Sequence, residues 1–200
     1  MSRFGAALGA IAADLDSLDV GWAVVGGCAL NAHGTRWPYR DIDLAISLSD
    51  DDAIGALAAS LRARGHGAWQ VPHGKLGLMV LVLPHVRGDP LGVLVDVLPR
   101  ACAFETELVA AARPMTVLGV RVPVACVGHL IAFKVKAMHD ATRPHDPAHL
   151  RALVRLANGE DLDLARQALL LRAERVSPRR LPRQTVRLPA QEGDAPGQPR

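Results

Sequence analysis

The feature that most constrains this fold is a short apolar run that ends in two glycines and is followed closely by a second apolar run. Residues 22–25 read Trp-Ala-Val-Val and lead into Gly26 and Gly27, and the second run covers 42–48. Short apolar runs bounded by glycines are typical of buried strands, and glycines at such a turn let the backbone approach a ligand closely. The segment therefore predicts a strand, a glycine turn, a short helix over 28–33 and a second strand.

Two aspartates, Asp41 and Asp43, flank Ile42 at the start of this second strand. Alternate residues of a strand face the same side of a sheet, so both carboxylates project together while Ile42 points into the core. A third acid, Asp96, interrupts the otherwise apolar run 93–98. An unpaired acid is costly to bury, and neighbouring carboxylates repel unless a cation lies between them. If the two strands are adjacent, the three acids make a candidate two-metal site for phosphoryl transfer.

The rest of the chain mixes helical and strand-like patterns and then becomes helical. Apolar spacings of three and four predict helices, and β-branched runs predict strands, two of them read as an antiparallel hairpin. The predicted helices cover 4–18, 53–64, 127–138, 147–156 and 162–175, and the predicted strands cover 76–83 and 93–98, with a two-stranded ribbon in 115–124. This order predicts an α/β (α+β) fold with a mixed sheet flanked by helices and a C-terminal helical segment.

These patterns divide the 200 residues into three parts. We expect a core over 1–125, a helical segment over 126–176 packed on it, and a Pro- and Arg-rich tail over 177–200 without packed structure. Seven arginines against three acids give residues 172–200 a charge of +4, so the remainder carries −1 of the net +3. A basic tail can bind nucleic acid, which leaves an RNA-binding protein that acts through its tail as one alternative.

Composition bears on the cellular setting. Hydrophobic residues make up 50% of the chain, enough for a substantial core. The three cysteines, Cys28, Cys102 and Cys126, are odd in number and far apart, which is neither a disulfide framework nor zinc-finger spacing. No signal peptide or membrane-spanning run is visible. We therefore expect a cytoplasmic protein without a membrane partner.

The segment VGGCALNAHGTR…RDIDLAI resembles the nucleotidyltransferase superfamily, whose fold is that of DNA polymerase β and the antibiotic nucleotidyltransferases. Members share a Gly-Gly or Gly-Ser turn, a later Asp-x-Asp, and a third acid on a further strand. The downstream segment VPVACVGHLIAFKVKAMHDATRPHDPAHL is similar to the AbiEii-type toxin branch, which commonly has Leu and Lys on a helix followed by Arg and Asp. Together the similarity covers residues 22–150.

The resemblance implies a polymerase β-like fold and a role for each acid. Asp41, Asp43 and Asp96 would bind Mg²⁺, two ions being typical of such sites and Mn²⁺ an alternative, and Asp96 would also act as base toward an acceptor hydroxyl. One ion would lower the pKa of the acceptor and the other would neutralise the departing pyrophosphate.

The nucleotide would lie against the glycine turn. By resemblance Gly26 and Gly27 hold the triphosphate, and Lys134 lies on the helix where relatives place a cation near the phosphates. Arg36 and Arg40 are further candidates for phosphate contact. A surface lysine without such a role remains an alternative for Lys134.

The chain departs from the family pattern before its paired aspartates. Relatives often read Arg-x-Thr-x-Asp-x-Asp, whereas this chain has Trp37 and Tyr39 at the Arg and Thr positions. A contact to the nucleotide or the acceptor is therefore altered here.

A second departure lies downstream. The Arg-x-x-Lys-Asp-x-x-Asp pattern of relatives appears as Arg143 followed by His145, Asp146 and His149, so the lysine and the last acid have become histidines. Asp146 before Pro147 also fits a helix N-cap with proline in the first turn. The spacing of the two histidines suits zinc, but eight histidines in the chain make one such spacing expected by chance.

The function implied is transfer of a nucleoside monophosphate from a nucleoside triphosphate, such as ATP, to an acceptor hydroxyl. The acceptor can be RNA, a protein or a small molecule, and the AbiEii-type resemblance adds a toxin–antitoxin role with a cognate antitoxin as partner. The other class that fits is a catalytically inactive binding module with this fold.

Overall fold

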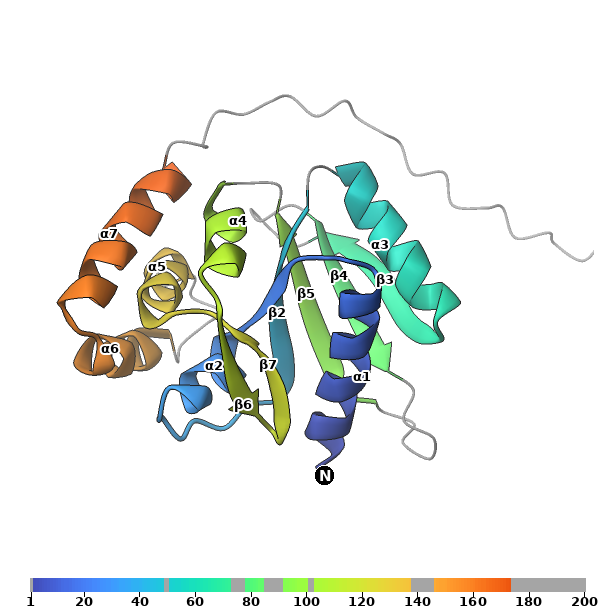
Figure 1. The fold of residues 1–200 in the computed structure, drawn as a ribbon, viewed down its shortest axis with the longest axis horizontal. Coiled ribbons are helices and arrows are strands. Elements are labelled where there is room, and N and C mark those ends of the chain that lie inside the picture. The colour runs from blue at the N-terminus through green and yellow to red at the C-terminus, as the bar shows by residue number, and fades with distance from the viewer. Residues whose placement is uncertain are drawn as a thin grey trace, which may run out of the picture.

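The computed structural model describes residues 2–48, 51–72, 78–84, 92–100, 103–137 and 146–173 (Figure 1). These residues contain a seven-stranded mixed sheet with the order β3-β4-β5-β2-β1-β7-β6. The strands are β1 (Trp22–Val25), β2 (Asp41–Ser47), β3 (His66–Pro72), β4 (Leu78–Pro84), β5 (Leu94–Arg100), β6 (Arg113–Val117) and β7 (Val120–Val124). The mixed sheet flanked by helices confirms the predicted α/β fold.

The helices are α1 (Arg3–Ser17), α2 (Gly26–Ala32), α3 (Asp51–Ala63), α4 (Ala103–Ala110), α5 (Val127–Ala137), α6 (Asp146–Leu156) and α7 (Gly159–Ala173). Figure 1 shows α1 and α3 together on one side of the molecule and α5, α6 and α7 grouped on the other. The last three described helices therefore form the helical segment that the sequence predicts.

Strand β2 lies at the centre of the sheet. It pairs antiparallel with β1 and parallel with β5, so the strand that carries Asp96 does lie beside the strand that carries Asp41 and Asp43. Ile42, Leu44 and Ile46 are fully buried on one face of β2, as the alternation of a half-buried strand requires. The predicted hairpin of β4 and β5 and the ribbon of β6 and β7 are both antiparallel pairs, and β7 joins the main sheet beside β1.

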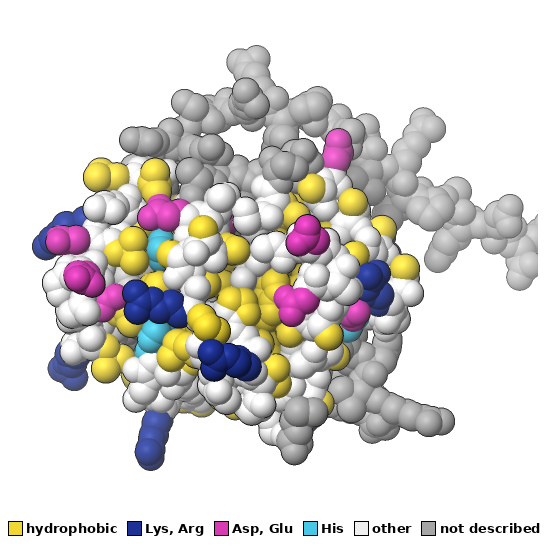
Figure 2. Space-filling view, viewed as in Figure 1, with side chains coloured by type: hydrophobic (Ala, Val, Ile, Leu, Met, Phe, Trp, Pro, Cys, Tyr) yellow, Lys and Arg dark blue, Asp and Glu magenta, His cyan; other side chains and the backbone are white. Residues whose placement is uncertain are grey.

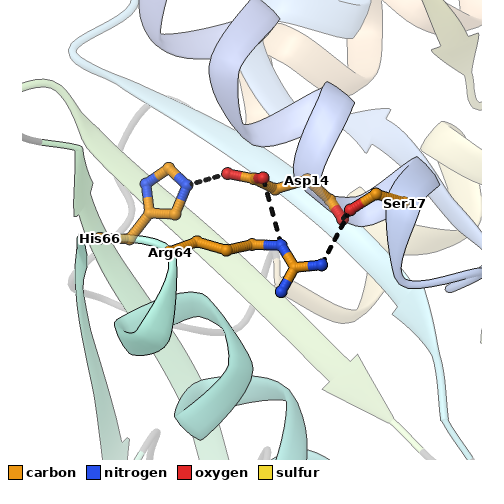
Figure 3. Close-up of polar contacts among 4 residues, drawn as sticks. All are labelled: Asp14, Ser17, Arg64 and His66. Atoms are coloured by element: carbon orange, nitrogen blue, oxygen red, sulfur yellow. Dashed lines mark hydrogen bonds and ion pairs between the residues drawn. The ribbon is translucent and has the colours of Figure 1, made fainter.

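Two links tie the helices to this sheet. Asp14 near the end of α1 contacts Arg64 and His66, which lie at the junction of α3 and β3 (Figure 3). On α4, Thr106 Oγ1 lies 2.9 Å from Ser47 Oγ at the end of β2. Because Ser47 is an alternate residue of the same strand as Asp41, α4 covers the far end of the face that carries the acids.

The C-terminal helices pack on one another and on α4. A Cβ at Gly128 of α5 would lie 2.5 Å from the backbone oxygen of Asp161 in α7, so this glycine permits the close approach of the two helices. Phe104 and Leu108 of α4 are fully buried.

The structure differs from the expectations in a few places. Strand β3 and helix α4 were not predicted, and α2 begins at Gly26, so it includes both glycines of the turn. Cys102, Arg143, His145 and the tail 177–200 lie outside the described residues. Among the helices that are described, none combines the length and the apolarity that crossing a membrane requires.

Candidate metal centre

Three carboxylates meet on adjacent strands at one end of the sheet. In the β2–β5 ladder Asp43 lies directly opposite Asp96, and Asp41 lies opposite Leu94. One carboxylate oxygen from each of the three aspartates lies within 4.8 Å of the other two. All three side chains are partly exposed. The structure thus brings together the three acids that the sequence singles out.

The glycine turn fits closely around this group. Val25, the last residue of β1, pairs with Asp43, so Gly26 follows directly beside the acid. Gly26 has φ of +61°, and a Cβ there would lie 1.8 Å from Asp43 Oδ2. A side chain at this position is therefore excluded twice, by backbone conformation and by the carboxylate. At Gly27 a Cβ would lie 3.3 Å from Tyr39 Cβ, which is a tight contact.

Cys28 of α2 is packed against the backbone of Asp41. Its thiol is buried and lies 3.8 Å from the backbone oxygen of Asp41. Burial, reinforced by the negative charges of Asp43 and Asp41, raises the pKa of this thiol to about 12. Cys28 is therefore a protonated packing residue, as its apolar surroundings in the sequence indicate.

The donor set suits a hard divalent cation. Carboxylate oxygens are the ligands that Mg²⁺ and Mn²⁺ prefer, and a site formed by one or two carboxylates leaves positions for phosphate oxygens. The three aspartates are each partly exposed, so an ion can approach the group from solvent. The residues present therefore fit a metal ion of this class.

Two arginines shortly precede Asp41 in the chain. Arg36 and Arg40 lie in the segment between α2 and β2, and both are exposed. Among the residues that the structure describes, neither arginine has a hydrogen-bond or ion-pair partner. Both guanidinium groups are therefore available to an anion.

Lys134 is differently placed. Its ammonium group lies 2.5 Å from Asp146 Oδ1, with side-chain exposures of 13% and 6%. Asp146 is the first residue of α6, and His149 Nδ1 lies 3.8 Å from the same Asp146 oxygen. Asp146, which the sequence also allows as a simple cap, thus joins α6 to α5 through an ion pair.

Sequence reasoning missed the contacts of Trp37. Its ring lies 4.7 Å from the ring of His149, and its backbone is hydrogen-bonded to the side chain of Asn31 in α2. The available signal was that Trp37 and His149 are both departures from the family pattern.

Charge is dispersed over much of the described surface. Figure 2 shows Lys and Arg side chains standing apart from one another on this face, interspersed with Asp and Glu. The three aspartates, by contrast, gather like charge within 4.8 Å of one another.

Comparison with known proteins gives a likeness of fold. No protein-family model matches the chain, and no curated protein matches its sequence. An antigenic nucleotidyltransferase-like protein from Paracoccidioides brasiliensis has 16% identity and a TM-score of 0.54, with 86% of this chain and 88% of that chain covered.

The antibiotic-resistance factor ANT(2'')-Ia is similar in two structures. Its solution structure has 19% identity and a TM-score of 0.55, with 85% of this chain and 92% of that chain covered. Its crystal structure with adenylyl-2''-tobramycin has 18% identity and a TM-score of 0.56, with 86% and 99% covered. The chain therefore has the fold of nucleotidyltransferase-like proteins over most of its length.

Proposed function

We propose that this protein is a metal-dependent nucleotidyltransferase that moves a nucleoside monophosphate from a nucleoside triphosphate to an acceptor hydroxyl. The observation that carries the proposal is the meeting of Asp41, Asp43 and Asp96 within 4.8 Å, beside a glycine turn with no room for a side chain. Like charges so close together favour a divalent cation, and the neighbouring glycine backbone allows a phosphate chain to approach.

Each residue has a definite task in this reaction. Asp41, Asp43 and Asp96 would hold Mg²⁺, or Mn²⁺, which when bound neutralises phosphate charge and lowers the pKa of the acceptor hydroxyl. The acceptor oxygen attacks the α-phosphorus, the bond to pyrophosphate breaks, and Asp96 accepts the proton of the hydroxyl. Gly26 and Gly27 bind the triphosphate through their backbone.

The cations near the phosphates are proposed to be Arg36 and Arg40. Both are exposed and have no partner within the described part of the chain, whereas Lys134 has Asp146 at 2.5 Å. A guanidinium group can bind two phosphate oxygens at once, which suits this role. Lys134 then contributes to phosphate binding only if its remaining N–H donors reach the nucleotide.

The acceptor is an RNA, a protein or a small molecule. The crystal structure of ANT(2'')-Ia contains adenylyl-2''-tobramycin, so a protein of this fold is seen with a nucleotidylated small molecule. That likeness supports a small-molecule acceptor, while a toxin–antitoxin role would require a macromolecular target and a cognate antitoxin. We also propose that 1–125 form the catalytic core, that 126–176 pack on it, and that 177–200 form an unpacked tail.

The proposal is tested by label transfer. The protein is incubated with each α-³²P-labelled nucleoside triphosphate, Mg²⁺, total RNA and cell extract, beside the Asp41→Ala/Asp43→Ala double variant. We expect label in an acceptor with the wild type alone, and the labelled fraction identifies RNA, protein or small molecule. Equal labelling by the double variant would refute the assignment of the acids.

An inactive binding module is the second candidate, and the engagement of Lys134 by Asp146 favours it. In such a module the lysine would stabilise the helical segment instead of the nucleotide. Nucleotide binding separates the two, because an enzyme binds its triphosphate with a divalent metal and loses it in Asp43→Ala. Absence of nucleotide binding by the wild type in Mg²⁺ would favour the module.

A further inference from the structure

Two positions at which this chain departs from the resembled family lie in contact with each other. Trp37 stands where relatives often have arginine, and His149 stands where they have an acid. Their ring centroids are 4.7 Å apart with an interplanar angle of 67°, an edge-to-face arrangement. This geometry is the favourable one for two aromatic rings. Residues of opposite charge at these two positions would also attract each other.

The backbone of Trp37 is fixed from the other side by Asn31. Asn31 Oδ1 accepts a hydrogen bond from the Trp37 N–H at 2.7 Å, and Asn31 Nδ2 donates to the Trp37 carbonyl at 2.8 Å. The same Asn31 Oδ1 accepts from Thr35 Oγ1 at 3.0 Å. Asn31 belongs to α2, the helix that begins at the glycine turn. Trp37 is therefore held by the element that borders the acids.

His149 connects this segment to the C-terminal helices. Its side chain is 15% exposed and its Nδ1 lies 3.8 Å from Asp146 Oδ1, the oxygen that pairs with Lys134 of α5. Tyr39, the other departure, packs edge-to-face on Phe4 of α1 with centroids 5.1 Å apart. The segment that leads into Asp41 is therefore anchored to α6 at Trp37 and to α1 at Tyr39.

We infer that Trp37 and His149 form a positioning pair, which anchors the segment leading into Asp41 on α6 and so holds the metal-binding carboxylates in register. The inference rests on the proposed function, because it assigns the pair to the same site. Neither residue is a metal ligand. Only a few residues separate Trp37 from Asp41, so a shift of the anchor is passed along the backbone to the first carboxylate.

The test is Mn²⁺ affinity, followed by electron paramagnetic resonance of the free ion, for variants whose folding is checked by chemical denaturation. The variants are Trp37→Ala, Trp37→Phe, His149→Asp and the charge pair Trp37→Arg/His149→Asp. The control is His66→Ala, which removes a histidine contact to Asp14 between α1 and β3 and touches no residue of the acidic centre.

Mutation of residues that support the ligands of a metal site typically lowers the affinity for the metal by about 10- to 100-fold. We expect a loss of this size in Trp37→Ala and His149→Asp, near-normal affinity in Trp37→Phe, and recovery in the charge pair. His66→Ala should bind Mn²⁺ like the wild type even though its midpoint of unfolding falls.

The two proposals fail differently. Wild-type affinity in Trp37→Ala, or no recovery in a folded charge-pair variant, would overturn the positioning role while the metal site stands. A wild type that binds no Mn²⁺ would overturn the proposed function and the positioning role with it. If Trp37→Ala unfolds, His149→Asp and the charge pair still decide, because normal affinity in a folded His149→Asp variant would overturn the positioning role.

Discussion

Two clusters of charged side chains in this molecule use carboxylates in opposite ways. At the acidic centre three aspartates, Asp41, Asp43 and Asp96, offer oxygens within 4.8 Å of one another. In the cluster of Figure 3 a single aspartate, Asp14, lies 3.3 Å from Arg64 Nε and 2.5 Å from His66 Nε2.

The difference contrasts a carboxylate that links two elements of the fold with a group of carboxylates that we propose holds a metal ion. Asp14 has opposite charge and a donor beside it, and it ties α1 to the α3–β3 junction, so folding alone explains it. The three aspartates gather like charge on adjacent strands, which opposes folding and would be compensated by the proposed cation. The same kind of substitution in each cluster should therefore affect stability and activity differently.

The largest difference is expected from alanine at a glycine of each region. Gly26 and Gly65 have φ of +61° and +88°, so alanine at either costs about 1–2 kcal/mol of stability. At Gly26 the added Cβ would also displace Asp43, whereas at Gly65 nothing lies within 4 Å. Gly26→Ala should lower nucleotidyl transfer on the order of 100-fold, as a displaced catalytic group does. Gly65→Ala is the matched control for the transfer assay, and equal activity of the two variants would break the comparison.

Metal should stabilise the protein through one cluster only. At a Mn²⁺ concentration of 100 times Kd, the free energy of unfolding should rise by about 2.7 kcal/mol. The increment should persist in His66→Ala, which lacks the histidine of the second cluster, and should be lost in Asp41→Asn. Urea denaturation of each variant, with Mn²⁺ and with EDTA, measures this increment. An increment that survives in Asp41→Asn would place the ion elsewhere.

Removing one charge from each cluster without metal should change stability in opposite directions. Asp14→Asn should lower the free energy of unfolding by about 1 kcal/mol, because the partly exposed ion pair with Arg64 is weak. Asp41→Asn should leave it unchanged or raise it by up to about 1 kcal/mol, because repulsion among like charges is relieved. Urea denaturation in EDTA measures the free energy of unfolding of both variants without metal. A loss of stability in Asp41→Asn that matches Asp14→Asn would show that Asp41 is structural.

The smallest effect concerns a buried histidine outside both clusters. His129 is fully buried, and burial lowers its pKa below 6.5, although Glu107 at 3.8 Å opposes this. Between the lowered pKa and 6.5 the unfolded chain binds the proton and the folded protein does not, so stability falls as pH falls below 6.5. The loss should be less than about 1 kcal/mol over the first pH unit. In His129→Gln this slope should flatten, and an unchanged slope would assign it to another group.

The acidic centre could be predicted from sequence because it depends on short-range rules. Alternation along a strand places Asp41 and Asp43 on one face, and an acid within an apolar run marks Asp96. Gly26 was recognisable as a turn glycine, and the structure adds the reason, which is the approach of Asp43 Oδ2.

Other elements could not be read in this way. Strand β3, His66–Pro72, contains a glycine and a glutamine and lacks alternation, and its strand character comes from pairing with β4. Helix α4 is short, Ala103–Ala110, and is held by burial of Phe104 and Leu108 against its neighbours. Such elements are determined by tertiary contacts more than by local preference.

Side-chain partners across the fold were also beyond the sequence. The pairing of Lys134 with Asp146 and the contact of Trp37 with His149 join residues on different helices and segments. Their positions depend on how α5 and α6 pack, which periodicity does not specify. The sequence gives one indication of the second contact, which is that Trp37 and His149 both depart from the pattern of the resembled family.

The most direct test of the acidic centre is binding of a non-hydrolysable nucleoside triphosphate analogue, measured by calorimetry with Mg²⁺ and with EDTA, for wild type and Asp43→Ala. We predict binding by the wild type that requires Mg²⁺ and is lost in the variant. Binding that is the same in EDTA, or that persists unchanged in Asp43→Ala, would contradict the claim that these carboxylates hold a metal ion against a nucleotide.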